Sequence, residues 1–285
     1  MVGARLRLLL ATFVLIAMTH AVKAQVPTQG QIIFDDAYGL KALNLADGVV
    51  SKLFDRPNVG QFRTLSKMSD HELLFDNTDP EVIQEIDLET GAVRFVTDGI
   101  VPTALRDGRF TFYAFDKTKE WYRLLLGTIQ PTGASAAEIN PGPFFFPRQT
   151  VSISKDEIIF GDAPGAQKLS EVYRYNIKDH SMKALPVFNC SPVAWRPLVG
   201  EFLCEGRVGT PYLLFDRNGI RVGELQLPRG SLVVGYIPET DSLLVNEPGF
   251  GVEVRNLYSY DFKRKQMKKL LDRAFVGVGG AIFVK

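Results

Sequence analysis

Histidine, cysteine and tryptophan are scarce in this chain of 285 residues, which contains three His, two Cys and two Trp. One of the histidines lies near the N-terminus, so only His71 and His180 belong to the rest of the sequence. A structural zinc site usually needs four ligands, most of them Cys and His. The composition therefore argues against a zinc protein of the usual kind.

Several catalytic and nucleotide-binding motifs are also missing. The sequence has no Gly-x-Ser-x-Gly segment, which would mark the nucleophile turn of a serine hydrolase. It has neither a Walker loop nor a Gly-x-Gly-x-x-Gly segment after a strand, so nothing predicts a phosphate or dinucleotide cradle.

The charge of the chain is balanced. Lys and Arg number 33 against 32 Asp and Glu, a formal net charge of +1. A nucleic-acid-binding protein normally carries a basic face or stripe, and this composition indicates none, so we expect no nucleic-acid partner. We also expect no transmembrane segment after the first 24 residues, because no later stretch is apolar over the roughly 20 residues that a span needs.

The N-terminus has the layout of a secretory signal peptide. Arg5 and Arg7 precede the apolar run 8–18, and the small residues Ala21 and Ala24 frame a cleavage site. We therefore predict a signal peptide over 1–24 and a periplasmic or secreted protein. The alternative is an uncleaved N-terminal anchor. The mature chain, 25–285, is expected to be a single domain.

A short pattern recurs six times at intervals of 40–45 residues. This period, with strand-like segments inside each unit, is typical of a β-propeller. The copies are Phe34-Asp35-Asp36, Phe75-Asp76-Asn77, Phe115-Asp116-Lys117, Phe160-Gly161-Asp162, Cys204-Glu205-Gly206 and Val245-Asn246-Glu247.

The second unit shows four strand signals in about 40 residues, separated by turn sequences such as Asn77-Thr78-Asp79-Pro80 and Glu89-Thr90-Gly91. We predict an all-β, six-bladed propeller of four-stranded antiparallel blades. The first unit begins at Gln31 with what matches a second strand. The C-terminal tail, through one or two strands, is therefore expected to complete the first blade.

The repeats resemble the TolB-type propeller repeat, also called the WD40-like or PD40 repeat. Asp87-Leu88-Glu89-Thr90-Gly91 matches the Asp-Leu-x-Thr-Gly element of that family, and Ser69-Asp70-His71 and 195–200 match its Ser-Pro-Asp-Gly turn loosely. The likeness covers nearly the whole mature chain and concerns the fold. It implies a propeller without the extra N-terminal domain of TolB.

Acidic residues follow the repeated strand in most units. Symmetry would arrange them as a ring on the face that carries the inter-blade loops, where they could attract Ca²⁺ or a basic peptide. The alternative is ordinary turn chemistry repeated in each blade. The candidate metal ligands are Asp36, Asp76, Asp116, Asp162, Glu205 and Glu247. We expect no other cofactor.

An aromatic loop links the third and fourth units. It contains Phe144, Phe145 and Phe146, followed by Arg148, and it is stiffened by prolines. Neighbouring residues of a strand point to opposite faces, so at least one Phe is expected on the surface as a binding residue. The alternative is a loop that plugs the mouth of the channel. Arg207 and Phe250, in two other hairpins, are weaker candidates.

Cys190 and Cys204 belong to neighbouring strands of the fifth unit. They form a disulfide if the register places both on one face, and are otherwise two small buried residues.

These features favour a binding scaffold for another envelope or extracellular protein or peptide. One alternative is a propeller hydrolase or lyase, of lactonase or glycan-acting type, with a metal in the central channel. The other is non-catalytic carbohydrate binding by the aromatic face.

Overall fold

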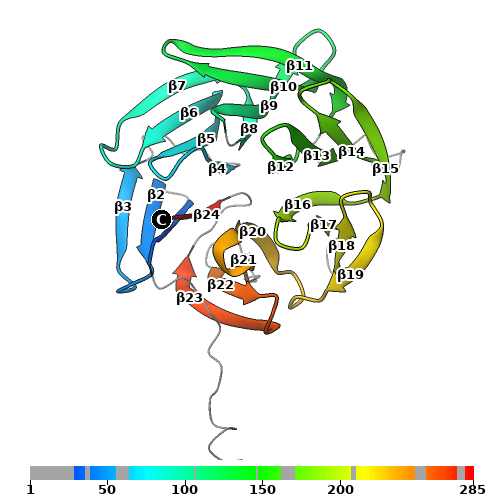
Figure 1. Ribbon diagram of the computed structural model, residues 1–285. Coiled ribbons are helices and arrows are strands. Elements are labelled where there is room, and N and C mark those ends of the chain that lie inside the picture. The colour runs from blue at the N-terminus through cyan, green and yellow to red at the C-terminus, as the bar shows by residue number, and fades with distance from the viewer. Residues whose placement is uncertain are drawn as a thin grey trace, which may run out of the picture.

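The computed structural model describes residues 29–35, 39–55, 64–105, 107–145, 147–161, 171–206, 210–247, 255–274 and 280–285. These residues form six antiparallel sheets of four strands, arranged as a ring with one strand of each sheet nearest the centre (Figure 1). The predicted six-bladed propeller is therefore confirmed. Within the described ranges the only helix is the short 3₁₀ turn η1 (Pro238–Thr240), so no helix there is long and apolar enough to cross a bilayer.

The blades follow one another in sequence order around the ring. From centre to periphery, blade 1 contains β24 (Ala281–Val284), β1 (Gln31–Asp35), β2 (Gly39–Asn44) and β3 (Val50–Asp55). Blade 2 contains β4 (Leu65–Lys67), β5 (Glu72–Thr78), β6 (Glu81–Asp87) and β7 (Val93–Asp98). Blade 3 contains β8 (Ile100–Ala104), β9 (Arg109–Asp116), β10 (Trp121–Gln130) and β11 (Gly133–Phe144). Blade 4 contains β12 (Val151–Ser154), β13 (Glu157–Gly161), β14 (Glu171–Asn176) and β15 (Met182–Phe188). Blade 5 contains β16 (Ser191–Arg196), β17 (Glu201–Glu205), β18 (Tyr212–Asp216) and β19 (Arg221–Leu225). Blade 6 contains β20 (Leu232–Ile237), β21 (Ser242–Asn246), β22 (Arg255–Asp261) and β23 (Gln266–Ala274).

The second strand of each blade is buried on both faces, which explains its continuous hydrophobic run. In β5, Leu73 packs with residues of blade 1, whereas its neighbour Leu74 packs with residues of blade 3. The buried side chains form six hydrophobic clusters in the described chain, one between each pair of adjacent blades. The core of this protein is therefore a ring of interfaces rather than one central cluster.

The ring is closed by β24, which pairs antiparallel with β1 from Gln31↔Val284 to Phe34↔Ala281. The prediction that Gln31–Phe34 is a second strand, completed by the C-terminal tail, is confirmed. One strand of the described tail joins the blade, rather than two. First and last blades are thereby held together by backbone hydrogen bonds as well as by packing.

Cys190 and Cys204 form a disulfide, with their Cα atoms 5.6 Å apart. Cys190 lies just before β16, and Pro192 pairs with Cys204 on β17. Cys190 is thus two residues from the direct partner of Cys204, which puts both side chains on one face. Both cysteines belong to the hydrophobic cluster between blades 4 and 5, so the disulfide connects the two sides of the β16–β17 hairpin inside the core.

Candidate functional site

The aromatic linker between blades 3 and 4 is divided between core and surface. Phe144 is 1% exposed and packs edge-on against Tyr113 and Phe160, with ring centroids 5.1 and 6.2 Å away. The prediction that Phe144 is a surface binding residue is wrong, because its side chain belongs to the core between blades 3 and 4. Phe145, the next residue, is 43% exposed, and Arg148 is exposed as well. Phe146 lies outside the described residues.

The far end of this linker is fixed by hydrogen bonds to two other blades. The Gln149 side-chain amide donates to the carbonyl of Leu65 in blade 2, at 3.3 Å. The Thr150 hydroxyl lies 2.6 Å from that of Thr111 in blade 3. Phe144 is thus held in the core between blades 3 and 4, whereas Gln149 and Thr150 contact blades 2 and 3. Phe145 and Arg148, called the rim patch below, lie between these residues in the sequence.

A cavity of about 310 Å³ lies between the inner strands at the centre of the ring. Blades 2, 4, 5 and 6 and the closing strand β24 all contribute to its lining, as do Gln149 and Thr150 of the linker. Trp195 of β16 and Tyr236 of β20 supply aromatic walls, and Ser66 and Ser152 supply hydroxyl groups. The cavity is thus mixed in character, with aromatic, aliphatic and neutral polar surfaces.

The charged groups at this cavity have partners of opposite charge. Lys67 Nζ lies 2.5 Å from Asp70 Oδ1, and the hydrogen bond from Lys67 lowers the pKa of Asp70. Lys285 Nζ lies 3.5 Å from Glu239 Oε1. The charge of each lining residue is therefore largely balanced within the protein.

A buried ion pair joins blades 5 and 6 beside the cavity. Arg196 donates from Nε and Nη2 to the two oxygens of Asp241, at 2.9 and 2.6 Å, and the Tyr236 hydroxyl donates to Asp241 at 2.9 Å. Burial by itself raises the pKa of Asp241, but the hydrogen bonds from Arg196 and Tyr236 outweigh it and leave the pKa below its usual value. The Arg196 guanidinium also stacks 3.7 Å from the ring centre of Phe262. Burial raises the pKa of Tyr236.

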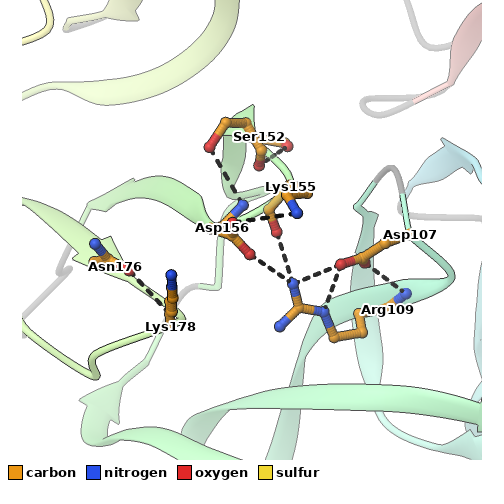
Figure 2. Close-up of polar contacts among 8 residues, drawn as sticks. Asp107, Arg109, Ser152, Lys155, Asp156, Asn176 and Lys178 are labelled. Carbon is orange, nitrogen blue, oxygen red and sulfur yellow. Dashed lines mark hydrogen bonds and ion pairs between the residues drawn. The ribbon is translucent and has the colours of Figure 1, made fainter.

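A similar contact joins blades 3 and 4 (Figure 2). Nη2 of Arg109, at the start of β9, donates to Asp107, to the Lys155 carbonyl and to Asp156 at 2.6, 2.9 and 3.2 Å. The hydrogen bond that Arg109 donates lowers the pKa of Asp107. Lys155 and Asp156 form the turn after β12, so this contact holds the turn that follows Ser152.

Asp76, one of the predicted metal ligands, is buried in the core instead of exposed on the surface. It is fully buried and accepts hydrogen bonds from the backbone N–H groups of Thr64, at 2.7 Å, and of Val101, at 2.8 Å. Thr64 precedes the inner strand of its own blade, and Val101 belongs to the inner strand of the next. The carboxylate of Asp76 thus connects two neighbouring blades.

The other described acids of the expected ring serve separate local contacts. Asp116 accepts from the backbone and hydroxyl of Thr118, and the hydroxyl bond lowers the pKa of Asp116. Glu247 accepts from Asn256 and Tyr258, both at 2.9 Å, and the Asn256 bond lowers its pKa. Glu205 lines a small cavity of about 40 Å³ between blades 5 and 6.

The strand registers explain why these acids are not equivalent. Asp76 and Glu205 occupy matching positions, four residues after the start of the second strand, whereas blade 6 has Asn246 there and Glu247 is one residue further. In the described part of the chain, no three His, Cys, Asp or Glu side chains are grouped to hold a metal. Asp36 and Asp162, like the weaker candidates Arg207 and Phe250, fall outside the described residues.

Sequence reasoning did not single out the central cavity or the residues around it. Trp195 was visible only as part of a loosely matching turn, and nothing marked Gln149, whose partner is 84 residues away. The Arg196–Asp241 pair also spans two repeats. Trp195 could have been named as a candidate channel residue, because a tryptophan on an inner propeller strand faces either a neighbouring blade or the channel.

Neither a scan against protein-family models nor a search of curated proteins finds a match for the chain. Solved structures do resemble it. TolB from Acinetobacter baumannii matches with a TM-score of 0.68 and 13% identity over 92% of this chain and 68% of that one. A nidogen/laminin complex structure matches with a TM-score of 0.69 and 10% identity, over 90% of this chain and 98% of that one.

An oligogalacturonate lyase in complex with manganese is less similar, with a TM-score of 0.51 and 14% identity over 85% of this chain and 73% of that one. At these identities the likeness shows the fold alone. The TolB-like propeller architecture expected from the repeats is thus confirmed.

Proposed function

We propose that this protein is an exported propeller that binds another envelope or extracellular protein or peptide through the rim patch. The observation that carries the proposal is the state of Phe145, which is 43% exposed while the residue before it is buried. An exposed aromatic side chain directly after a buried one starts from a backbone position that core packing holds. The nearby Arg148 adds a cation that can pair with an acidic group.

A surface that is ordered before binding loses less free energy when a partner docks on it. Aromatic residues and Arg are enriched among the side chains that dominate protein interfaces. Ordering a mobile side chain or loop on binding costs free energy, and a loop already ordered avoids much of that cost. The hydrogen bond from Gln149 to Leu65 and the burial of Phe144 hold the residues next to Arg148 and Phe145, which reduces this cost.

Two further observations support the proposal. The signal-peptide pattern over 1–24 favours a place in the periplasm or outside the cell. One of the similar structures is described as a nidogen/laminin complex, which supports a protein partner for a propeller of this shape.

The test is quantitative co-purification from cells that produce the tagged protein. The double variant Phe145→Ser with Arg148→Ser should lose its partner at least tenfold, because both rim side chains are removed. Phe95→Ser is the matched control, since Phe95 is 54% exposed but lies on the outer strand β7. Equal recovery of the partner by both variants would show that the rim patch does not bind it.

A further inference from the structure

The central cavity differs from the rim patch in position and in chemistry. It lies among the inner strands, and its lining includes Trp195, Tyr236, Ser66 and Ser152. Its volume of about 310 Å³ is at the lower end of the range of about 300–1,000 Å³ found for small-molecule sites. A site of this size suits one small molecule rather than a folded domain.

The charges around the cavity limit what it can bind. Lys67 is paired with Asp70, and Glu239 with Lys285, so neither offers a free charge to a ligand. The third ionisable lining group, the Tyr236 hydroxyl, already donates to Asp241. An ion entering the cavity would meet no uncompensated counter-charge, so the lining gives it no electrostatic gain. The cavity therefore favours a neutral ligand.

The neutral lining groups indicate the shape and polarity of that ligand. Trp195 packs against the cluster between blades 4 and 5, but it is only half-buried and lines the cavity, so part of its indole ring is accessible there. A flat aromatic surface packs well against the aliphatic C–H face of a saturated ring, and its burial contributes favourable apolar area. Three polar lining groups already make one hydrogen bond each: Ser66 Oγ accepts from Ala104 N–H, Ser152 Oγ donates to the Ser154 carbonyl, and the Gln149 amide donates to Leu65. The Ser66 O–H, the Ser152 lone pairs and the Gln149 amide oxygen keep the capacity to bond hydroxyl groups on a ring edge.

We propose that the central cavity binds a neutral sugar ring, stacked on Trp195. This site adjoins the rim patch, because Gln149 lines the cavity and follows Arg148, but it would take a different kind of ligand. The structure also makes it measurable, because the chain has only two tryptophans and the other, Trp121, lies on β10 outside the cavity lining.

The experiment uses intrinsic fluorescence of the full mature chain. In Trp121→Phe, all tryptophan emission comes from Trp195. Titration with methyl β-D-glucopyranoside, methyl β-D-galactopyranoside and N-acetylglucosamine should give a saturable change in emission for at least one sugar. D-glucuronate, an anionic ring of similar size, should bind at least tenfold more weakly. Trp195→Phe, which keeps Trp121, should show no change, and its sugar contacts should vanish in saturation-transfer NMR.

Circular dichroism checks that each variant is folded. If Trp121→Phe misfolds, the emission of Trp195 is obtained instead by subtracting the fluorescence of Trp195→Phe from that of the wild type. The proposal is overturned if no neutral sugar gives a saturable change in folded protein. It is equally overturned if Trp195→Phe responds like the wild type, or if glucuronate binds as tightly as the neutral sugars.

Discussion

Individual carboxylates in this propeller hold blades together, and each does so through a different set of donors. Asp76 accepts backbone N–H groups from two blades, whereas Asp241 accepts a guanidinium and a phenol hydroxyl. Buried acceptors of this kind are expensive to remove, because the donors that they satisfy lose their partners without regaining water.

Replacing Asp76 is therefore expected to destabilise the whole fold. Asp76→Ala leaves the N–H groups of Thr64 and Val101 without this acceptor, and we expect a loss of about 3 kcal/mol in unfolding free energy. Urea denaturation followed by circular dichroism measures it. Asp179→Ala is the control, because Asp179 is exposed and its bonds to Ser181 are local. A loss no greater than that of the control would show that Asp76 does not connect the blades.

The Asp241 pair should make stability depend on pH. The pKa of Asp241 is lowered in the folded protein from a starting value of 3.8. Its contribution is therefore complete above that value and is lost as the pH falls through the folded pKa. Asp241→Asn also tolerates the left-handed backbone at this position. Because Arg196 still pairs with Glu201, the change should cost about 2 kcal/mol at pH 7 and progressively less below pH 4. A cost independent of pH would contradict the assignment.

At the scale of elements, the repeat was visible in the sequence because each second strand must be apolar on both faces. Runs such as Ile32-Ile33-Phe34 and Leu73-Leu74-Phe75 follow directly from burial between two blades. The closing role of the tail could also be predicted, since the first repeat lacked an inner strand. Both inferences needed only the hydrophobic pattern and its period.

The candidate site was less accessible to sequence reasoning. In blade 3, Asp116 was aligned with Asp76, but β9 extends further and places Asp116 at the turn. A shift of one residue reverses the face of a strand, so a ring inferred from spacing alone is unreliable. Which of Phe144 and Phe145 is exposed depends on how β11 meets the blade 3–4 core, and contacts between distant segments decide that.

The β16–β17 hairpin carries the disulfide, and its contribution can be measured. The bond links residues 14 apart, and a loop of that length is expected to contribute about 3 kcal/mol, mostly by restricting the unfolded chain. Replacing both Cys190 and Cys204 with Ala should lower the unfolding free energy by that amount, and a reducing agent should then have no further effect. An unchanged stability in the double variant would contradict this role.

At the scale of the whole molecule, the ring depends on the close approach of β20 to the closing strand. A Cβ atom at Gly235 would lie 2.1 Å from the carbonyl oxygen of Ala281, so Gly235→Ala must displace β24. We expect faster hydrogen exchange at 281–284 and a lower melting temperature. Gly223→Ala, also in a strand but with ordinary contact distances, is the control. Unchanged exchange at β24 would show that this contact does not govern closure.

The central functional claim is that the anchored linker between blades 3 and 4 presents the surface that a partner contacts. Its most direct measurement is photo-crosslinking with benzoylphenylalanine placed at position 145 in cells that produce the protein. We expect a discrete crosslinked adduct at position 145 that is absent when the probe replaces Phe95. Adducts at both positions, or at position 95 alone, would contradict it.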